Sequence, residues 1–318
     1  MRSETTYAYY PGCSQLGTAT DYDKSTRACC AKLDIHLQDI PDWSCCGSTP
    51  AHTVDHTLSG ALSLRNLQLA EQLNPTCITT PCPSCLTNLK GAAQKAEDPQ
   101  SREAMNALLD TPYTGSLDVK STLQILVEDF GVDALAAKVS KPLTGLVVAP
   151  YYGCIMNRPP EIMDFDDPEN PTAMDTVLEA LGAEVVPFPL KVECCGASYA
   201  VARRDIVMQL SGKLLDLAQD NGADAVATAC PLCQMNLDLR QGQINSAQGR
   251  NFQMPVFYYT QLMGLAFSLG RSDLGLSRLN VDPEIALQRA EERNRERERL
   301  RAEKKKGGKQ ADSEASAA

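Results

Sequence analysis

Apolar residues along this chain form two kinds of pattern, short nearly continuous runs and longer stretches with helical spacing. Short continuous runs are typical of strands buried on both faces, and helical spacing is typical of helices with one buried face. The pattern predicts strand, helix, strand, helix and strand, and then the same order again. The expected elements are 6–10, 23–33, 35–40, 58–73 and 76–80, followed by 143–149, 173–181, 183–188, 206–220 and 223–228.

Strands that alternate with helices in this way form parallel sheets with helices on their faces. We therefore predict an α/β fold of two pseudo-symmetric Rossmann-like domains, at residues 1–141 and 142–275, each with a parallel sheet. A charged tail at 276–318 follows. It is rich in Glu, Arg and Lys from Pro283 to Lys306, which predicts a solvated helix or a disordered arm, with disorder from Gly307 onward. Its expected role is a solubilising end or a docking arm for a partner.

Cysteine motifs repeat in step with these elements. Each half has a lone Cys, then Cys-Cys-Gly, then Cys-x-x-Cys. Matching cysteines are 141, 149 and 148 residues apart for the three motifs in turn, which indicates a duplicated domain with an insertion near 166–171 in the second copy. The candidate ligands are Cys13, Cys45, Cys46, Cys82 and Cys85 in the first half, and Cys154, Cys194, Cys195, Cys230 and Cys233 in the second.

Each motif directly follows a predicted strand, and ligands of open α/β sheets bind beside the carboxyl ends of strands. We therefore expect the three motifs of each half to meet. Pro83 and Pro231 suit the first turn of helices that begin at Cys82 and Cys230. Adjacent cysteines point apart on a strand, so the Cys-Cys pairs require a bent loop. We also expect the glycines after them, Gly47 and Gly196, to admit a bulky inorganic group beside the backbone.

The cysteine content, the apolar runs and the net charge limit the class of protein. The 318 residues contain 13 cysteines, an odd number in a chain that is large for a disulfide-stapled scaffold. The N-terminus has no apolar signal-like run and no stretch is long enough to predict a membrane span, so we expect a cytoplasmic protein with reduced cysteines. The net charge of −10 argues against nucleic acid as a partner. Cys29, Cys30 and Cys77 have no counterpart in the second half and are interpreted as core residues.

Five cysteines per half limit the possible cofactors. Structural zinc takes four ligands and a cubane iron–sulfur cluster takes four thiolates. Either one Cys in each half is spare or the cofactor needs five, and the same surplus in both halves favours the second reading. Neither a Gly-x-Gly-x-x-Gly motif nor a ferredoxin-type cysteine run occurs, so the sequence predicts no flavin or nicotinamide site of its own.

The motifs resemble the CCG domain, and their duplication resembles the B subunit of heterodisulfide reductase over about residues 6–270. The likeness rests on the segments Tyr9–Cys13, Asp42–Gly47, Tyr151–Cys154 with Arg158-Pro159, and Asp167–Pro171. The resemblance implies two noncubane [4Fe-4S] clusters, one held by each set of five cysteines named above. It also implies a disulfide substrate between the clusters, a partner like the family's C subunit with ferredoxin-type clusters, and a flavin-containing partner like its A subunit.

Three functions remain open at this point. The first is an oxidoreductase subunit that acts on sulfur groups and reduces a disulfide to two thiols, or runs in reverse. The second is a non-catalytic electron-relay subunit of a dehydrogenase complex. The third is a zinc-stabilised interaction protein. Two complete motifs favour the first function over the second, because a disulfide requires two electrons and paired clusters supply one each.

Overall fold

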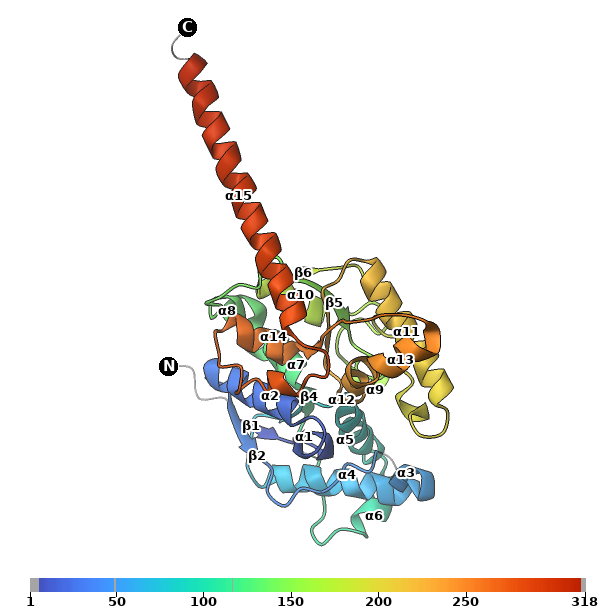
Figure 1. Cartoon of the computed structure of the whole chain (residues 1–318). Helices are drawn as coiled ribbons and strands as arrows, with labels where there is room; N and C mark the ends of the chain where they lie inside the picture. The colour runs from blue at the N-terminus through green and yellow to red at the C-terminus, as the bar shows by residue number, and fades with distance from the viewer. Residues whose placement is uncertain (1–5, 49, 116, 316–318) are drawn as a thin grey trace.

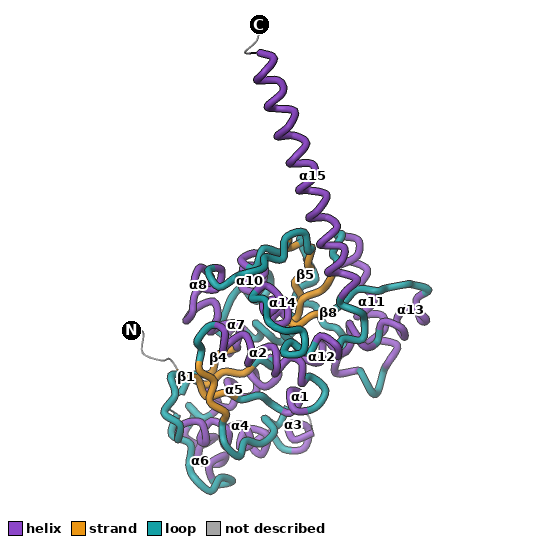
Figure 2. Tube along the Cα trace, turned by 60° about the vertical axis from the view of Figure 1, so that its left-hand side comes forward, coloured by secondary structure: helices purple, strands orange, loops and turns teal. Residues whose placement is uncertain are grey.

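The computed structural model describes residues 6–48, 50–115 and 117–315, with side chains described up to residue 300 except at residue 50. Two lobes of helices and strands lie one above the other, and the helix α15 projects away from the upper lobe (Figure 1). The strands gather into two groups, one in each lobe, when the chain is viewed as a tube (Figure 2). The lobes correspond to the two halves of the sequence.

The strands of the first half form a parallel sheet in the order β2-β1-β3-β4. Its elements, as far as the chain is described, are β1 (Thr6–Tyr9), α1 (Cys13–Leu16), α2 (Thr20–Lys32), β2 (His36–Asp39), α3 (Pro50–Val54), α4 (His56–Glu71), β3 (Ile78–Thr80), α5 (Pro83–Lys95), α6 (Pro99–Asn106), β4 (Val119–Ser121), α7 (Thr122–Gln124), the π-helix η1 (Ile125–Gly131) and α8 (Val132–Ala136).

The second half repeats this topology in the order β6-β5-β7-β8, again with parallel pairing. Its elements are β5 (Val147–Tyr151), α9 (Pro160–Met163), α10 (Ala173–Ala180), β6 (Glu184–Val185), η2 (Ala197–Tyr199), α11 (Arg204–Asp220), β7 (Ala225–Thr228), α12 (Pro231–Gln234), the π-helix η3 (Met235–Leu239), α13 (Gln241–Gln248), β8 (Val256–Tyr258), α14 (Tyr259–Ala266), η4 (Leu276–Arg278) and α15 (Glu284–Ala315).

The predicted α/β architecture with two parallel sheets is confirmed, and several elements differ in detail. The fourth strand of each sheet, β4 and β8, was not predicted. Strand β6 is shorter than the predicted 183–188 because Pro187 cannot donate to a neighbouring strand. Strand β5 begins after the predicted start at Leu143, because Leu146 closes a turn onto the Leu143 carbonyl.

The two lobes share a hydrophobic core. Helix α2 of the first half packs on α14 of the second, and α10 of the second packs on α7 and α8 of the first. The reciprocal contacts give the molecule a pseudo-twofold arrangement. The buried side chains between the lobes include Tyr22 and Cys29 from α2, and Cys29 donates to the Thr260 carbonyl of α14. The halves are therefore repeats of one fold that pack as a single body.

Helix α15 begins as part of the second lobe. Ala286 and Ala290 are buried, and Gly145 admits the helix because a Cβ there would lie 2.6 Å from the Ala290 carbonyl oxygen. Arg293 pairs with the buried Asp224 at 2.7 Å. The structure differs from the predicted solvated or disordered tail in two ways: these first turns are packed, and the helix continues beyond Gly307, where disorder was expected.

Candidate functional site

The cysteine motifs of the first half lie at the carboxyl edge of their sheet, as the sequence predicts. Cys13 opens α1 just after β1, and the loop that carries Cys45 and Cys46 follows β2. Cys82 is the N-cap of α5 after β3, with Pro83 at the first helical position and Cys85 in the first turn. The second half repeats this placement, with Cys230 as the N-cap of α12.

Thiols from different motifs approach each other in the first half. The Sγ atoms of Cys46 and Cys85 are 3.7 Å apart. The hydrogen bond between the thiols of Cys46 and Cys85 lowers the pKa of Cys46 and raises the pKa of Cys85, and the contact between Cys85 and Cys82 lowers the pKa of Cys82. Burial raises the pKa of Cys13, and the neighbouring charge of Cys45 adds to this rise. All five predicted residues of this half therefore lie within electrostatic reach of one another.

The second half shows the same meeting of thiols. The Sγ atoms of Cys195 and Cys233 are 3.5 Å apart. A hydrogen bond from Cys154 lowers the pKa of Cys194 to about 6, and the backbone N–H of Gly196 helps because it donates to the same sulfur at 3.2 Å. Metals bind the thiolate form of cysteine, and each half contains two cysteines whose pKa is lowered by a neighbouring thiol, namely Cys46 and Cys82 in the first half and Cys194 and Cys195 in the second. Among the described residues, no group of three or more His, Cys, Asp or Glu is arranged around a single metal ion.

Matched hydrogen bonds hold the Cys-Cys loop of each half. Tyr10 donates to the carbonyl of the residue before the first pair, and Tyr151 does the same in the second half, each at 2.7 Å. Ser63 donates to the Cys46 carbonyl at 2.8 Å and Ser211 to the Cys195 carbonyl at 2.9 Å. Tyr10 and Tyr151 lie in the segments on which the resemblance rests, but their role was not predicted, and Ser63 and Ser211 were not singled out at all. They recur at the spacing of the neighbouring motifs, and that regularity could have revealed them.

The glycines close to the thiols are different ones from those we expected. A Cβ on Gly12 would lie 2.7 Å from the Cys85 Sγ, and a Cβ on Gly153 would lie 3.0 Å from the Cys233 Sγ. By contrast, a Cβ on Gly47 would meet Ser59 and one on Gly196 would meet Val207. The expectation that Gly47 and Gly196 make room for an inorganic group is therefore wrong. They let the loop pack on α4 and α11, whereas the glycine before each lone Cys leaves space beside the thiols.

Two contacts link the cysteine sites across the lobes. Tyr22 stacks on Tyr258 with ring centroids 4.0 Å apart and planes 2° apart. The Tyr22 hydroxyl donates to the Pro81 carbonyl at 3.1 Å, next to Cys82. Tyr258 ends β8 in register with Thr228, two residues before Cys230. The stacked rings therefore run from the Cys82 segment of one lobe to the Cys230 segment of the other.

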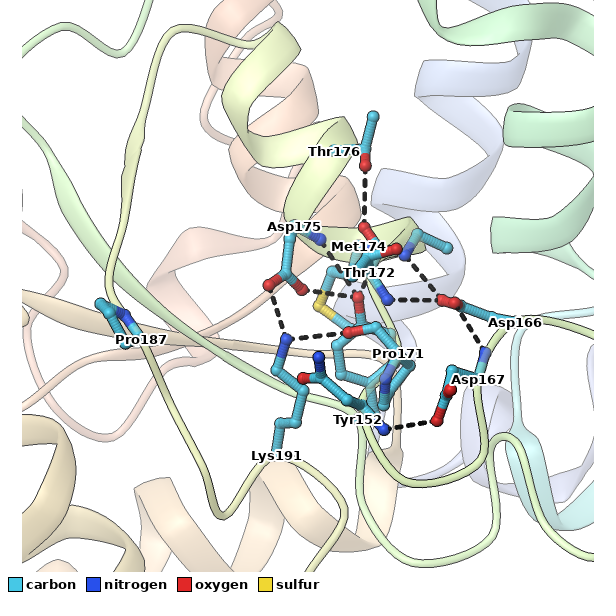
Figure 3. Close-up of polar contacts among 12 residues, drawn as sticks. Tyr152, Asp166, Asp167, Pro171, Thr172, Met174, Asp175, Thr176, Pro187 and Lys191 are labelled. Atoms are coloured by element: carbon cyan, nitrogen blue, oxygen red, sulfur yellow. Dashed lines mark hydrogen bonds and ion pairs between the residues drawn. The ribbon is translucent and has the colours of Figure 1, made fainter.

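The predicted insertion is a loop beside the second site. Figure 3 shows the ammonium of Lys191 between the Asp175 carboxylate and the Pro171 carbonyl, at 2.7 and 2.8 Å. The backbone carbonyl of Lys191 accepts from Tyr152 and from Gly153, next to Cys154. Lys191 is 6% exposed. This buried residue therefore joins the inserted loop, the helix α10 and the Cys154 segment of the second site.

The segment between Cys154 and the insertion contacts the first half. Lys90 of α5 donates to the Met163 carbonyl at the end of α9, at 2.7 Å. Thr87, one turn after Ser84 in the same helix, is 3.4 Å from the Ile155 carbonyl. The Cys154 segment of one half thus packs beside the helix that carries Cys85 of the other. The three cysteines without counterparts, Cys29, Cys30 and Cys77, are buried in the shared core, as predicted.

The fold and the sites define a duplicated α/β protein with two matched sets of five cysteines. The model of the CCG family, described as a cysteine-rich domain, matches residues 7–90 and 148–238. The chain belongs to this family.

Curated relatives carry two kinds of name. The chain is 37% identical to the 8-methylmenaquinol:fumarate reductase membrane anchor subunit of Wolinella succinogenes, over 87% of this chain and 97% of that one. It is 29% identical to the B subunit of the ferredoxin:CoB-CoM heterodisulfide reductase of Methanosarcina mazei, over 83% and 90%. A protein of Archaeoglobus profundus that is named as like the B subunit of heterodisulfide reductase is 30% identical, over 81% and 89%.

A solved structure supports the fold. A hypothetical protein from Helicobacter pylori matches with a TM-score of 0.71 at 15% identity, over 88% of this chain. The chain spans about half the length of that protein, 53%. In the part of our chain that is described, no helix combines the length and the apolar character that crossing a bilayer requires.

Proposed function

We propose that the chain is an iron–sulfur subunit of an oxidoreductase complex and carries electrons to or from a disulfide at two clusters, one in each half. Cys13, Cys45, Cys46, Cys82 and Cys85 would hold the first cluster, and Cys154, Cys194, Cys195, Cys230 and Cys233 the second. The observation that carries this proposal is the convergence of three sequence-distant motifs in each half, with thiols 3.7 and 3.5 Å apart.

The residues present fit such a group. Thiolates are the ligands that iron–sulfur clusters use. Gly12 and Gly153 leave free the volume that a Cβ would fill beside the thiols of Cys85 and Cys233. Cys82 caps the thirteen-residue helix α5, whose first N–H groups point toward the site and favour negative charge there. Five thiols per site exceed the four ligands of structural zinc.

Disulfide chemistry is supported by the pairing of the sites. Iron–sulfur clusters supply electrons one at a time, and a disulfide needs two. The contacts of Tyr22 with Tyr258, and of α9 with α5, bring the two cysteine sites to the same interface. Holding two reaction partners in place beforehand removes an entropic barrier. The relatives named as B subunits of heterodisulfide reductase, or as like them, support the same choice.

A second candidate is an electron-relay subunit of a fumarate or succinate enzyme. The 37% identity to the fumarate reductase subunit of Wolinella succinogenes favours it. In that case, the clusters would pass electrons between partner subunits without a bound thiol. The two candidates share the cofactors and differ in whether sulfur compounds interact with them.

Thiol binding separates these functions. We expect small thiols, added to the anaerobic protein with its partner subunits, to change the electron paramagnetic resonance (EPR) spectra of both clusters. Their disulfides should be reduced or formed in turnover. The disulfide function would be contradicted if no thiol changed the EPR signal of either cluster while the complex oxidised a quinol or reduced fumarate. That result would support the electron-relay function.

A further inference from the structure

The side chain of Gln15 is buried and has no partner in the protein. It lies in α1, two residues after Cys13, and is 1% exposed. Neither its Oε1 nor its Nε2 makes a hydrogen bond. Among the described residues, it is the one buried side chain in which two polar atoms lack partners. Buried polar groups are nearly always hydrogen-bonded, so a carboxamide left in this state indicates a missing partner.

The carboxamide of Gln15 faces the first cysteine site. The position that a Cβ of Gly12 would occupy is 2.7 Å from the Cys85 Sγ and 3.7 Å from the Gln15 Oε1. The amide and the thiol therefore border the same small space. The oxygen and nitrogen of a carboxamide exchange places by a half turn, so the NH₂ group of Gln15 can point into this space.

The second site has an amide donor of its own, from another element. Asn236 lies in the π-helix η3, and its Nδ2 is 3.5 Å from the Cys195 Sγ. The matching residue of the first half, Asn88, lies in the regular helix α5 and donates to the Ser84 carbonyl at 2.7 Å instead. The π turn therefore aims Asn236 at Cys195, where its Nδ2 is also 3.4 Å from the carbonyl oxygen, while the regular turn directs Asn88 to the backbone of its own helix. The first site is left with Gln15 as its amide.

We propose that the Gln15 amide donates a hydrogen bond to a sulfur of the iron–sulfur group at the first site, and so raises the reduction potential of that group independently of the second. This inference rests on the proposed function. A donor beside a cluster sulfur stabilises the more negative, reduced state, and such hydrogen bonds are among the determinants of cluster potential. Asn236 donates in the same way at the second site, so each cluster is tuned by a different residue.

Redox titration of the anaerobic protein, followed by EPR, tests this assignment. Gln15→Met keeps the length of the side chain and removes the donor. We expect it to lower the potential of one cluster and leave the other unchanged, whereas Asn236→Leu should lower the potential of the other cluster. Asn88→Ala is the matched control, because it removes an amide that is bonded to the backbone, and should move neither potential.

A measurement on the unaltered chain covers the case in which Gln15→Met does not assemble its cluster. In protein labelled with ¹⁵N-glutamine, pulsed EPR should detect hyperfine coupling between the side-chain nitrogen and the first cluster. This inference alone would be overturned if Gln15→Met assembled both clusters with unchanged reduction potentials, or if the labelled chain showed no coupling between the glutamine nitrogen and the first cluster. Protein that holds no sulfide would overturn the proposed function and this inference with it.

Discussion

The two halves of the molecule hold their cysteine motifs by the same contacts and surround them with different polar groups. A tyrosine and a serine fix each Cys-Cys loop, and a glycine precedes each lone Cys. Around this shared frame, the second half has the buried Lys191, whereas the matching Asp42 of the first half is exposed and pairs with Arg65. Under the proposed function, the common contacts would hold a cluster in each half, and the different polar groups would give the two clusters different properties.

The strongest test of this comparison removes one ligand from each half. We expect Cys46→Ser and Cys195→Ser each to cost about half of the bound iron and sulfide, because a serine oxygen binds iron less well than thiolate. Either change should abolish turnover of disulfides by the assembled complex. Metal analysis with circular dichroism checks this, since the lobes share a core and unfolding must be separated from cluster loss. If either variant emptied both sites while folded, the sites would not be independent.

A Cβ at Gly12 should have the next largest effect. Gly12→Ala places an atom 2.7 Å from the Cys85 Sγ and adds backbone strain at φ 76°. Gly131→Ala is the matched control, because its φ is 93° and nothing lies within 4 Å of its Cβ position. Strain of this kind costs about 1–3 kcal/mol in both. We expect iron to be lost from the first site in Gly12→Ala alone, and equal iron content in the two variants would contradict the role of Gly12.

The first turns of α15 pack on the second lobe. Arg293 attaches them there through hydrogen bonds to Asp224 and to the Gly145 carbonyl. Arg293→Ala removes hydrogen bonds to Asp224, whose side chain is 4% exposed. Hydrogen bonds to charged groups contribute about 1.5–3 kcal/mol, and the partial exposure of Arg293 places the expected loss at the lower end. The pair of Arg203 with Asp205 provides the control, because both side chains are exposed and Arg203→Ala should change the free energy of unfolding less than Arg293→Ala does. Chemical denaturation measures both, and equal losses would mean that α15 is not anchored.

The smallest expected effect concerns the stacked rings of Tyr22 and Tyr258. Tyr258 is the N-cap of α14, and the matching N-cap in the first half, at the start of α7, is Ser121, which has no ring to stack. Tyr22→Phe keeps the ring against Tyr258 and loses the hydrogen bond to the Pro81 carbonyl, at a cost of about 0.5–1.5 kcal/mol. Tyr22→Leu should cost more because it also removes the ring contact. Denaturation curves of the two variants give the comparison, and a larger loss for Phe than for Leu would exclude a role for stacking.

The sequence was sufficient to predict the architecture and the meeting of the motifs, because strands and helices alternate and each motif follows a strand. It also predicted that Cys82 and Cys230 begin helices, since proline follows each of them. The rest depends on contacts between distant segments. The packing of α2 on α14, the neighbours of Gly12 and the unpartnered amide of Gln15 exist only once the lobes and loops come together. The π turn at Asn236 likewise has no signature in local propensity.

The identity of the cofactor is the central claim, and chemical analysis of the anaerobically purified chain tests it most directly. Two clusters of four irons predict about eight iron and eight acid-labile sulfide per chain, in protein made with a competent cluster-assembly system. About two zinc per chain without sulfide would contradict this claim, and would identify the five-cysteine sets as structural metal sites.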